Sequence, residues 1–390
     1  MMKQWIAGAL CTAGALLGAC EKLDHAPEKY LQDPPPTRRI SLEEVAELLS
    51  TLPIGPEQLS EVHGAVTSSE GNGYDSEYRM TEIFASPGAG VGDDAAATKA
   101  WTTPLRDLIR SAVLSRTKAG EDGTDPEAFL EALSGSDAQI YWPYAASWDG
   151  SEAPLVTFDP GDNSEKNIAY YRGTDGQIAE MVVDEQTARL RPVWVVNWND
   201  DAAYKSLELL RREDPSWGSG GEILLKSGTA SEEGIRTLIL RSFRANRNYD
   251  SWLSGASEFW VKIGAVEDFK ASTEAELLLY QPSITDFMVV VRRDQVGTEI
   301  PFNAVLVSEW TESLSSCAFM MIEDDGGTQT SWKCSATVKY NSKAYGFDLE
   351  IPLRTRDDIV WRGALSRSYI ERFNGETGHF GDVDLVLELI

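Results

Sequence analysis

From residue 139 to its end, the chain consists of short apolar segments separated by turn-forming residues. Segments that are rich in β-branched and aromatic residues and bounded by such turns are typical of β-strands. The clearest segment is 383–389, where aliphatic residues at odd positions alternate with Asp384, Val386 and Glu388. This part of the sequence therefore predicts a mainly β structure. The other expected strands are 140–144, 155–158, 168–171, 181–184, 193–198 and a further set that begins near Arg236.

Before residue 139, the apolar residues follow helical spacing instead. Ser41 and Glu44 have the spacing of a capping box, and a second helix is expected after Pro56. Two more helices are expected where Thr103 and Asp125 each precede a proline, because proline suits the first helical position. The sequence therefore predicts an α+β fold that is mainly β. Its expected parts are a small N-terminal helical region over 41–135, a central β-rich region over 136–234 and a C-terminal antiparallel β-sandwich over 235–390.

The first twenty residues have the features of a secretion signal. Lys3 provides a short positive region, and a mostly apolar stretch runs from residue 6 to residue 19. The stretch ends in Leu17-Gly18-Ala19-Cys20, which resembles the lipobox of bacterial lipoproteins. That resemblance implies removal of residues 1–19 and diacylation of the Cys20 thiol, so that acyl chains anchor the protein to a membrane. The alternative is an ordinary signal peptide that is cleaved after Ala19.

The residues after Cys20 predict an extended tether and a localisation signal. Residues 20–40 are polar and contain three consecutive prolines, which favours an extended linker. Glu21 and Asp24 resemble the surface-export signal of Bacteroidota lipoproteins, and parts of the chain resemble uncharacterised surface lipoproteins of that group. The resemblance implies an outer-membrane location, with surface exposure as the further expectation, and it implies no ligand.

Charge and histidine content exclude several classes of function. The chain carries 62 acidic and 35 basic residues, for a net charge of −27, and this argues against a nucleic-acid partner. Arg241, Arg244 and Arg247 form a local basic spot, for which solubility at a strand edge is the simpler interpretation. With three histidines far apart and neither an HExxH nor a GxSxG motif, the sequence assigns no catalytic residue.

Two cysteines, Cys317 and Cys334, remain in the folded part after the signal and the lipidated residue are set aside. Asp325-Gly326 between them favours a two-residue hairpin turn, and that register would place the two cysteines directly opposite each other. Because opposed cysteines at such a position lie within bonding distance, the pattern predicts a disulfide in an oxidising envelope. Two unrelated buried thiols are the alternative.

A possible calcium site rests on a second resemblance. An alternating strand, an acidic loop and residues 257–263 (SEFWVKI) resemble the opening of a C2-type β-sandwich, and residues 319–326 (FMMIEDDG) resemble a later strand with its acidic loop. In calcium-binding C2 domains, loop carboxylates supply the oxygen ligands, and the matching positions here are Asp250, Asp324 and Asp325. Glu258 stands where the C2 pattern has aspartate, and a tight turn at Asp325 is a competing role.

Tryptophans suggest one further kind of ligand. Trp142, Trp148, Trp194 and Trp198 lie close together in the central region, and aromatic rings can stack on sugars. The alternative is that these rings fill the core of a β structure. Taken together, the sequence predicts a lipid-anchored protein with a non-enzymatic binding role towards an envelope protein or a glycan. A glycan-binding protein or a carbohydrate-active enzyme of the cell surface is the second hypothesis.

Overall fold

The structure is a computed structural model that describes residues 39–85, 101–118, 125–150, 152–173, 175–199, 204–213, 215 and 235–390. The chain divides into two compact units, Met1–Thr37 and Arg38–Ile390, and only the second contains described residues. The predictions for the signal, Cys20 and most of the tether therefore lie outside the described residues. None of the helices in the described ranges combines the length and the apolar character needed to cross a membrane.

The four predicted helices are all present. Ser41 caps the first helix, since its hydroxyl accepts a hydrogen bond of 3.1 Å from the Glu44 N–H. Asp125 caps the fourth in the same way, through the Glu127 N–H at 3.1 Å. These helices are α1 (Leu42–Thr51), α2 (Pro56–Gly71), α4 (Leu105–Lys118) and α5 (Pro126–Ser134). The shorter ones are α3 (Met80–Ile83), α6 (Glu185–Leu190), α7 (Leu207–Glu213), α8 (Glu274–Leu277) and α9 (Arg367–Arg372).

A six-stranded sheet follows, with the order β1-β2-β6-β3-β4-β5. Its neighbouring strands are antiparallel except β3 and β6, which are parallel. Two predicted strands, 155–158 and 193–198, have the bounds that the sequence predicts. The strands are β1 (Glu77–Arg79), β2 (Ala138–Tyr141), β3 (Leu155–Phe158), β4 (Lys166–Arg172), β5 (Ile178–Asp184) and β6 (Val193–Trp198).

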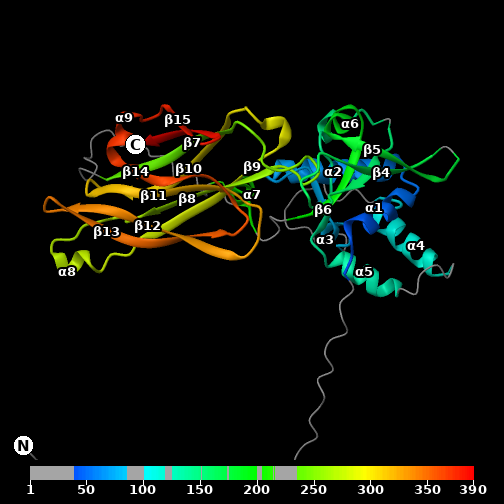
Figure 1. Cartoon of the computed structure of the whole chain (residues 1–390), viewed down its shortest axis with the longest axis horizontal. Coiled ribbons are helices and arrows are strands. Elements are labelled where there is room, and N and C mark those ends of the chain that lie inside the picture. The colour runs from blue at the N-terminus through cyan, green and yellow to red at the C-terminus, as the bar shows by residue number, and fades with distance from the viewer. Residues whose placement is uncertain are drawn as a thin grey trace, which may run out of the picture. The chain divides into compact units, whose positions relative to one another are not determined.

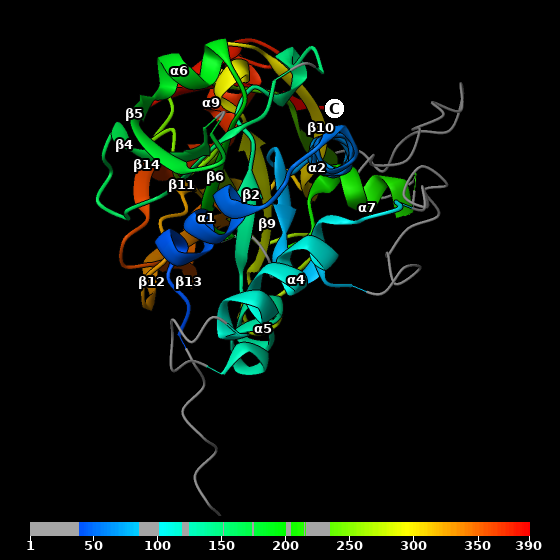
Figure 2. The ribbon, with the colours of Figure 1, turned by 90° about the vertical axis from the view of Figure 1, so that its right-hand side faces the viewer.

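Different elements pack on the two faces of this sheet. Trp194 and Val196 of β6 pack with residues of helices α1, α2, α4 and α5 in one core, and Figure 2 shows α1 and α4 on that face. Val193 and Val195 point to the opposite face, because side chains alternate along a strand. There they form a separate core that includes Trp252 from the loop between β7 and β8. A loop, rather than a helix, therefore covers part of the second face.

The rest of the chain forms two antiparallel sheets that share one core (Figure 1). One sheet has the order β10-β7-β16-β15, and the other has the order β13-β12-β11-β8-β9, with β14 also paired to β11. The predicted mainly β architecture is therefore confirmed. The strands are β7 (Arg236–Ala245), β8 (Ser257–Ala265), β9 (Ser283–Val291), β10 (Ile300–Trp310), β11 (Leu314–Glu323), β12 (Gln329–Tyr340), β13 (Lys343–Arg354), β14 (Asp358–Ser366), β15 (Thr377–Phe380) and β16 (Val383–Leu389).

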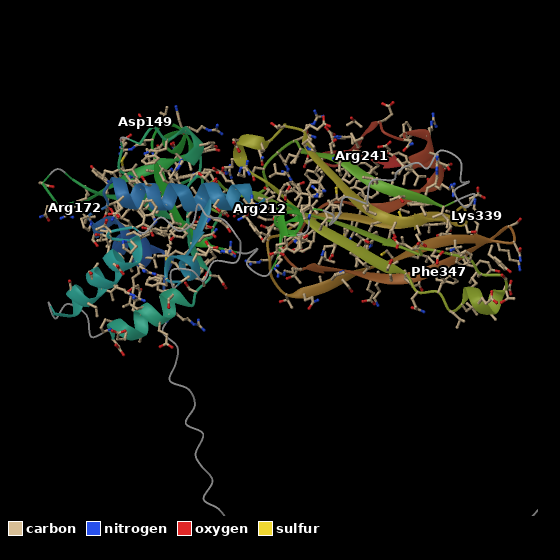
Figure 3. The ribbon with its side chains drawn as sticks, turned by 180° about the vertical axis from the view of Figure 1, so that it is seen from behind. Asp149, Arg172, Arg212, Arg241, Lys339 and Phe347 are labelled. Atoms are coloured by element: carbon tan, nitrogen blue, oxygen red, sulfur yellow. The ribbon has the colours of Figure 1, made fainter. Side chains whose placement is uncertain are left out.

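The predicted boundaries between regions stay predictions. Strand β1 lies in the predicted helical region, yet it belongs to the same sheet as the strands of the central region. Contacts also join the six-stranded sheet and its helices to the two-sheet part. Arg212 of α7, labelled in Figure 3, donates hydrogen bonds to the Asn72 side chain at 2.5 Å and to the Gly71 carbonyl at 2.9 Å.

The hairpin register predicted for the two cysteines is wrong. Strand β12 pairs with β11 only at the start of β11, through Leu314 and Ser316. Beyond that point, β14 takes the same edge of β11, because β8 occupies the other edge. Cys317 therefore lies opposite Leu365 of β14, and Cys334 lies opposite Leu349 of β13.

The predicted disulfide is also absent from the structure. Both cysteines carry free thiols. The Cys317 thiol donates to the Leu365 carbonyl and the Cys334 thiol to the Leu349 carbonyl, each at 3.7 Å. The intervening strand β14 is the physical reason that the two side chains do not meet.

Candidate cation site

Three acidic side chains gather at one end of the two-sheet part. Oxygens of Asp250, Glu258 and Glu323 all lie within 4.8 Å of one another. Asp250 belongs to the loop between β7 and β8, Glu258 is the second residue of β8, and Glu323 is the last residue of β11. The cluster therefore combines two adjacent strands with the loop that enters one of them.

Strand pairing and a loop contact bring these residues together. Strands β8 and β11 are paired so that Phe259 lies opposite Glu323, which places Glu258 beside the end of β11. The Ser257 hydroxyl accepts a hydrogen bond of 2.8 Å from the Tyr249 N–H, and it also contacts the Asn248 side chain. These contacts fold the loop back onto the start of β8, so that Asp250 returns to the side of Glu258.

Glu323 is fully enclosed, with an exposed fraction of 0%. Its carboxyl group interacts with the Asp250 carboxyl group and with the Ser257 hydroxyl, whose proton is directed to Asn248. No well-formed hydrogen bond reaches either Glu323 oxygen, or Oδ2 of Asp250, from the described residues. Removing a carboxylate from water is costly unless a positive charge or a hydrogen-bond donor replaces the lost solvation. The geometry therefore calls for a neutralising species between these oxygens, which can be a proton or a cation.

Further charges around the cluster are mostly negative. Burial, together with the neighbouring Asp250 carboxylate, raises the pKa of Glu323 well above its usual range, and burial also raises the pKa of Asp250. Burial and the carboxylates of Asp250 and Asp358 raise the pKa of Asp325 to about 6. Arg293 brings a positive charge beside Asp250: its guanidinium donates to the Asp250 backbone carbonyl at 2.5 Å and forms an ion pair of 3.4 Å with Glu185.

The donor set suits a hard divalent cation. All three ligand atoms are carboxylate oxygens, which calcium binds at about 2.3–2.6 Å. Two oxygens bound to one ion at about 2.4 Å can be at most about 4.8 Å apart, and the three oxygens here lie within that limit. Since the cluster contains neither cysteine nor histidine, it offers little to the softer transition metals. The residues present therefore fit calcium.

The structure places one of the three predicted calcium ligands in this cluster. The structure places Asp250 in the cluster, but Asp324 is directed elsewhere. Its carboxylate accepts from the Trp260 indole N–H at 3.1 Å and from Arg354 at 3.2 Å. Asp325 lies near enough to interact electrostatically with Asp250 but is not one of the three grouped carboxylates.

The sequence prediction did not include Glu258 and Glu323, which the structure places in the cluster. Glu258 was visible as the acidic residue in the C2-like pattern. Glu323 directly follows five apolar residues of β11, and an acidic residue at the end of such a strand was the available signal. Side chains alternate along a strand, so Glu323 and Asp324 point to opposite sides. Which of the two carboxylates points inward therefore depends on the register of β11.

Three of the four predicted sugar-binding tryptophans form part of a core instead. Trp142 and Trp194 are fully buried with their ring centroids 6.0 Å apart, and Trp148 packs 5.4 Å from Trp142. Trp198 is 47% exposed and belongs to none of these ring pairs. A buried indole offers no face for a sugar to stack on, so for Trp142 and Trp194 the core-filling interpretation holds.

The basic spot is neutralised by neighbouring carboxylates. Arg241, labelled in Figure 3, forms an ion pair with Glu388, and Arg244 forms one with Asp384. Arg247 lies 2.8 Å from Asp382. These pairs join adjacent strands or their connecting loops, and they give the arginines a structural role.

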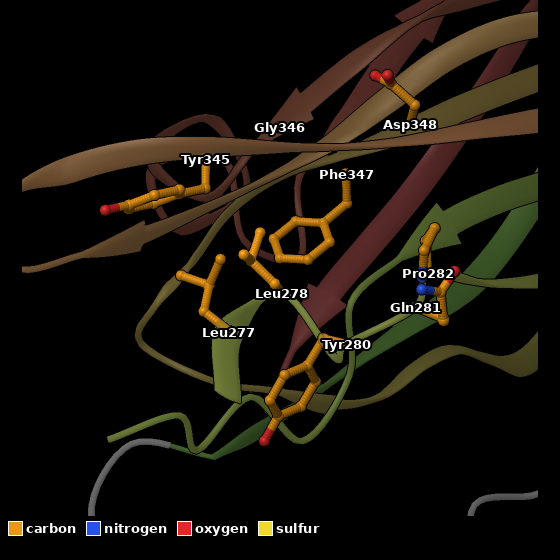
Figure 4. Close-up of a pocket in the computed structure, with 9 residues that line it drawn as sticks. All are labelled: Leu277, Leu278, Tyr280, Gln281, Pro282, Tyr345, Gly346, Phe347 and Asp348. Atoms are coloured by element: carbon orange, nitrogen blue, oxygen red, sulfur yellow. The ribbon is translucent and has the colours of Figure 1, made fainter. Parts of the chain in front are cut away.

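One hollow of about 260 Å³ lies beside helix α8 (Figure 4). Leu278 and Phe347 face each other across it, and the rings of Tyr280 and Tyr345 flank it. The tyrosine hydroxyls are already used, since Tyr280 accepts from the Lys270 N–H at 2.9 Å and Tyr345 donates to Glu274 at 2.7 Å. The acidic cluster is therefore the stronger candidate site.

Residues 137–279 match a family model described as a protein of unknown function (DUF3103). The match begins just before strand β2 and ends after helix α8, so it covers strands β2 to β6 of the six-stranded sheet, the loop with Asp250 and the strand with Glu258, but neither β1 nor Glu323. No curated protein and no solved structure matches the chain.

Proposed function

We propose that this chain is a lipid-anchored protein of the bacterial cell envelope, with a binding role rather than an enzymatic one, whose folded part holds a calcium ion. The anchor is supported by the lipobox-like residues 17–20 and by the polar tether that follows them. An outer-membrane location, with the folded part facing outward, is part of the same proposal. The partner would be another envelope component or an external glycan.

The observation that carries the cation site is the state of Glu323. This carboxyl group is fully buried, no well-formed hydrogen bond reaches its oxygens from the described residues, and it is grouped with Asp250 and Glu258. A structural carboxylate at such a depth ordinarily has an arginine, a lysine or several N–H groups around it. Here the grouped partners are two more carboxylates, which is the arrangement that a divalent cation stabilises.

Asp250, Glu258 and Glu323 would hold the ion, and the ion would supply positive charge next to the buried Glu323 carboxyl group. Calcium suits this location better than magnesium, because magnesium gives up its water shell reluctantly and is seldom bound by protein oxygens alone. The ion would act as a structural element that joins the loop after β7 to the ends of β8 and β11.

Isothermal titration calorimetry on the chelator-treated protein tests this proposal. We expect heat on addition of calcium to the wild type and a loss of at least tenfold in affinity in Glu323→Gln and Asp250→Asn. Glu376→Gln is the matched control, because Glu376 is exposed and lies directly before β15, outside the cluster. No heat at millimolar calcium, or equal binding in Glu323→Gln and the wild type, would overturn the cation site.

A further inference from the structure

Two of the three clustered carboxylates, those of Asp250 and Glu258, flank the loop segment 251–257. Asp250 and Glu258 lie at the two ends of residues 251–257, and the carboxylate oxygens of the two come within 4.8 Å of each other. The segment between them is therefore a closed loop whose base is the candidate cation site. Trp252 and Leu253, here called the tip of the loop, pack in a core of the six-stranded sheet.

The tip of this loop is buried against the six-stranded sheet. Trp252 and Leu253 both have an exposed fraction of 0%. They share a core with Leu155, Val193 and Val195, on the face of the sheet opposite helices α1, α2, α4 and α5. The Trp252 indole N–H donates a hydrogen bond of 3.0 Å to the Glu165 carbonyl, so even its polar atom is satisfied by the sheet side.

Polar contacts complete the docking. The Asn197 side chain donates to the carbonyls of Leu253 at 3.2 Å and Ser254 at 2.5 Å. The Ser254 hydroxyl donates to Asp159 at 3.1 Å. Gly255 has a φ of +136°, and a Cβ there would lie 3.1 Å from the Asp75 carboxylate, so the close approach requires glycine.

We infer that a cation bound by Asp250, Glu258 and Glu323 controls the docking of residues 251–257 onto the six-stranded sheet. This inference rests on the proposed cation site. Without an ion, a proton shared between Glu323 and Asp250 can link only those two groups, so Glu258 at the other end of the loop is not held to Asp250. With an ion, both ends of the loop are held together, and fewer loop conformations compete with the docked one.

Linkage makes the coupling reciprocal. If the ion binds better when the loop is docked, then docking strengthens ion binding by the same factor. A change at the tip of the loop must therefore alter calcium affinity, although no ligand is touched. The cation would in this way adjust how firmly the two-sheet part holds the six-stranded sheet.

Hydrogen exchange of the whole protein, with calcium and with chelator, tests the first half of this inference. We expect calcium to slow exchange at least tenfold in peptides that cover 251–257. The Ala256 N–H is the most direct probe, since it donates to Asp75 at 2.8 Å. Peptides from the paired strands β15 and β16 serve as the internal control and should change far less.

Calcium titration of Trp252→Phe tests the second half. We expect a several-fold weaker affinity than in Trp310→Phe, a matched change at a tryptophan that is equally buried but lies in the core of the two-sheet part. Asn197→Ala should act like Trp252→Phe if the latter does not fold. Calcium binding with unchanged exchange in 251–257 and equal affinities in these variants would overturn the inference and leave the cation site standing. No calcium binding to the wild type would overturn both.

Discussion

The Asp75 carboxylate accepts a hydrogen bond of 2.8 Å from the backbone N–H of Ala256, a residue 181 positions later in the chain. Asp75 follows helix α2, and Ala256 lies in the loop that docks onto the six-stranded sheet. A second hydrogen bond, of 2.7 Å, comes from the Ser76 N–H. One buried side chain thus joins the start of β1 to the entrance of β8.

Asp75 should make the stability of the protein depend on pH. Burial raises its pKa to about 6 from an ordinary value near 3.8, although the two N–H donors and Arg292 act in the opposite direction. The folded state therefore binds more protons than the unfolded state between about pH 4 and pH 6. Stability should fall as pH rises through that window, by up to about 3 kcal/mol, since one pKa unit corresponds to about 1.4 kcal/mol.

Chemical denaturation of the wild type and Asp75→Asn at several pH values between 4 and 7 measures this effect. Asparagine cannot ionise, but it keeps an oxygen for the Ala256 N–H, so the variant should show a flatter dependence on pH. Other raised carboxyls, such as Asp325, contribute equally to both proteins, and the difference between the two curves isolates Asp75. Parallel curves would show that Asp75 does not titrate in this range.

Glu323→Gln should have opposite effects with and without calcium. In chelator we expect the variant to be more stable than the wild type by about 1 kcal/mol, because an amide is neutral without taking up a proton at neutral pH and can donate to Asp250. The wild type should gain about 2.7 kcal/mol at a calcium concentration of about 100 times its Kd, and the variant should gain far less. Thermal unfolding with both additives checks this prediction, and an identical calcium shift in both proteins would contradict it.

Trp252→Ala should destabilise the protein by about 3–5 kcal/mol, since it removes a fully buried aromatic side chain. Trp198→Ala is the matched control, because that side chain is 47% exposed and should cost about 1 kcal/mol or less. Urea unfolding of both variants gives the comparison. Equal losses in the two would mean that Trp252 is not docked as the structure places it.

Both thiols of the folded part should be free and should react at different rates. Cys317 is fully buried and burial raises its pKa, whereas Cys334 is only partly buried. Alkylation of the native, unreduced protein should therefore modify Cys334 first and Cys317 only on unfolding. Peptide mapping by mass spectrometry distinguishes the two, and a linked peptide pair that contains both residues would restore the hairpin disulfide.

Lipidation should depend on Cys20 alone. Metabolic labelling with a fatty-acid analogue should label the wild type, and Cys20→Ser should lose both the label and the membrane association. Cys11→Ser is the control, because Cys11 lies in the segment that cleavage removes, and it should keep both. Labelled Cys20→Ser protein, or a mature N-terminus other than Cys20, would contradict the lipoprotein proposal.

Local signals in the sequence were enough to predict much of the secondary structure. Ser41 and Asp125 mark helix starts correctly, because an N-cap residue contacts an N–H only two or three residues away. The strands 155–158 and 193–198 were found from their own composition. The position of Cys317 opposite Leu365 was not, because a strand from 358–366 takes the place next to β11.

The candidate site also separates what local sequence signals predict from what long-range contacts decide. The sequence by itself determined the helix starts, the strand-rich body, the acidity and the terminal lipobox-like residues, all of which depend on neighbours in the chain. Only the tertiary structure decided that Glu323 rather than Asp324 turns inward, and that Trp252 fills a core of the six-stranded sheet. Those outcomes depend on strand register and on loop docking, where the interacting residues are tens of positions apart and no local pattern records their contact.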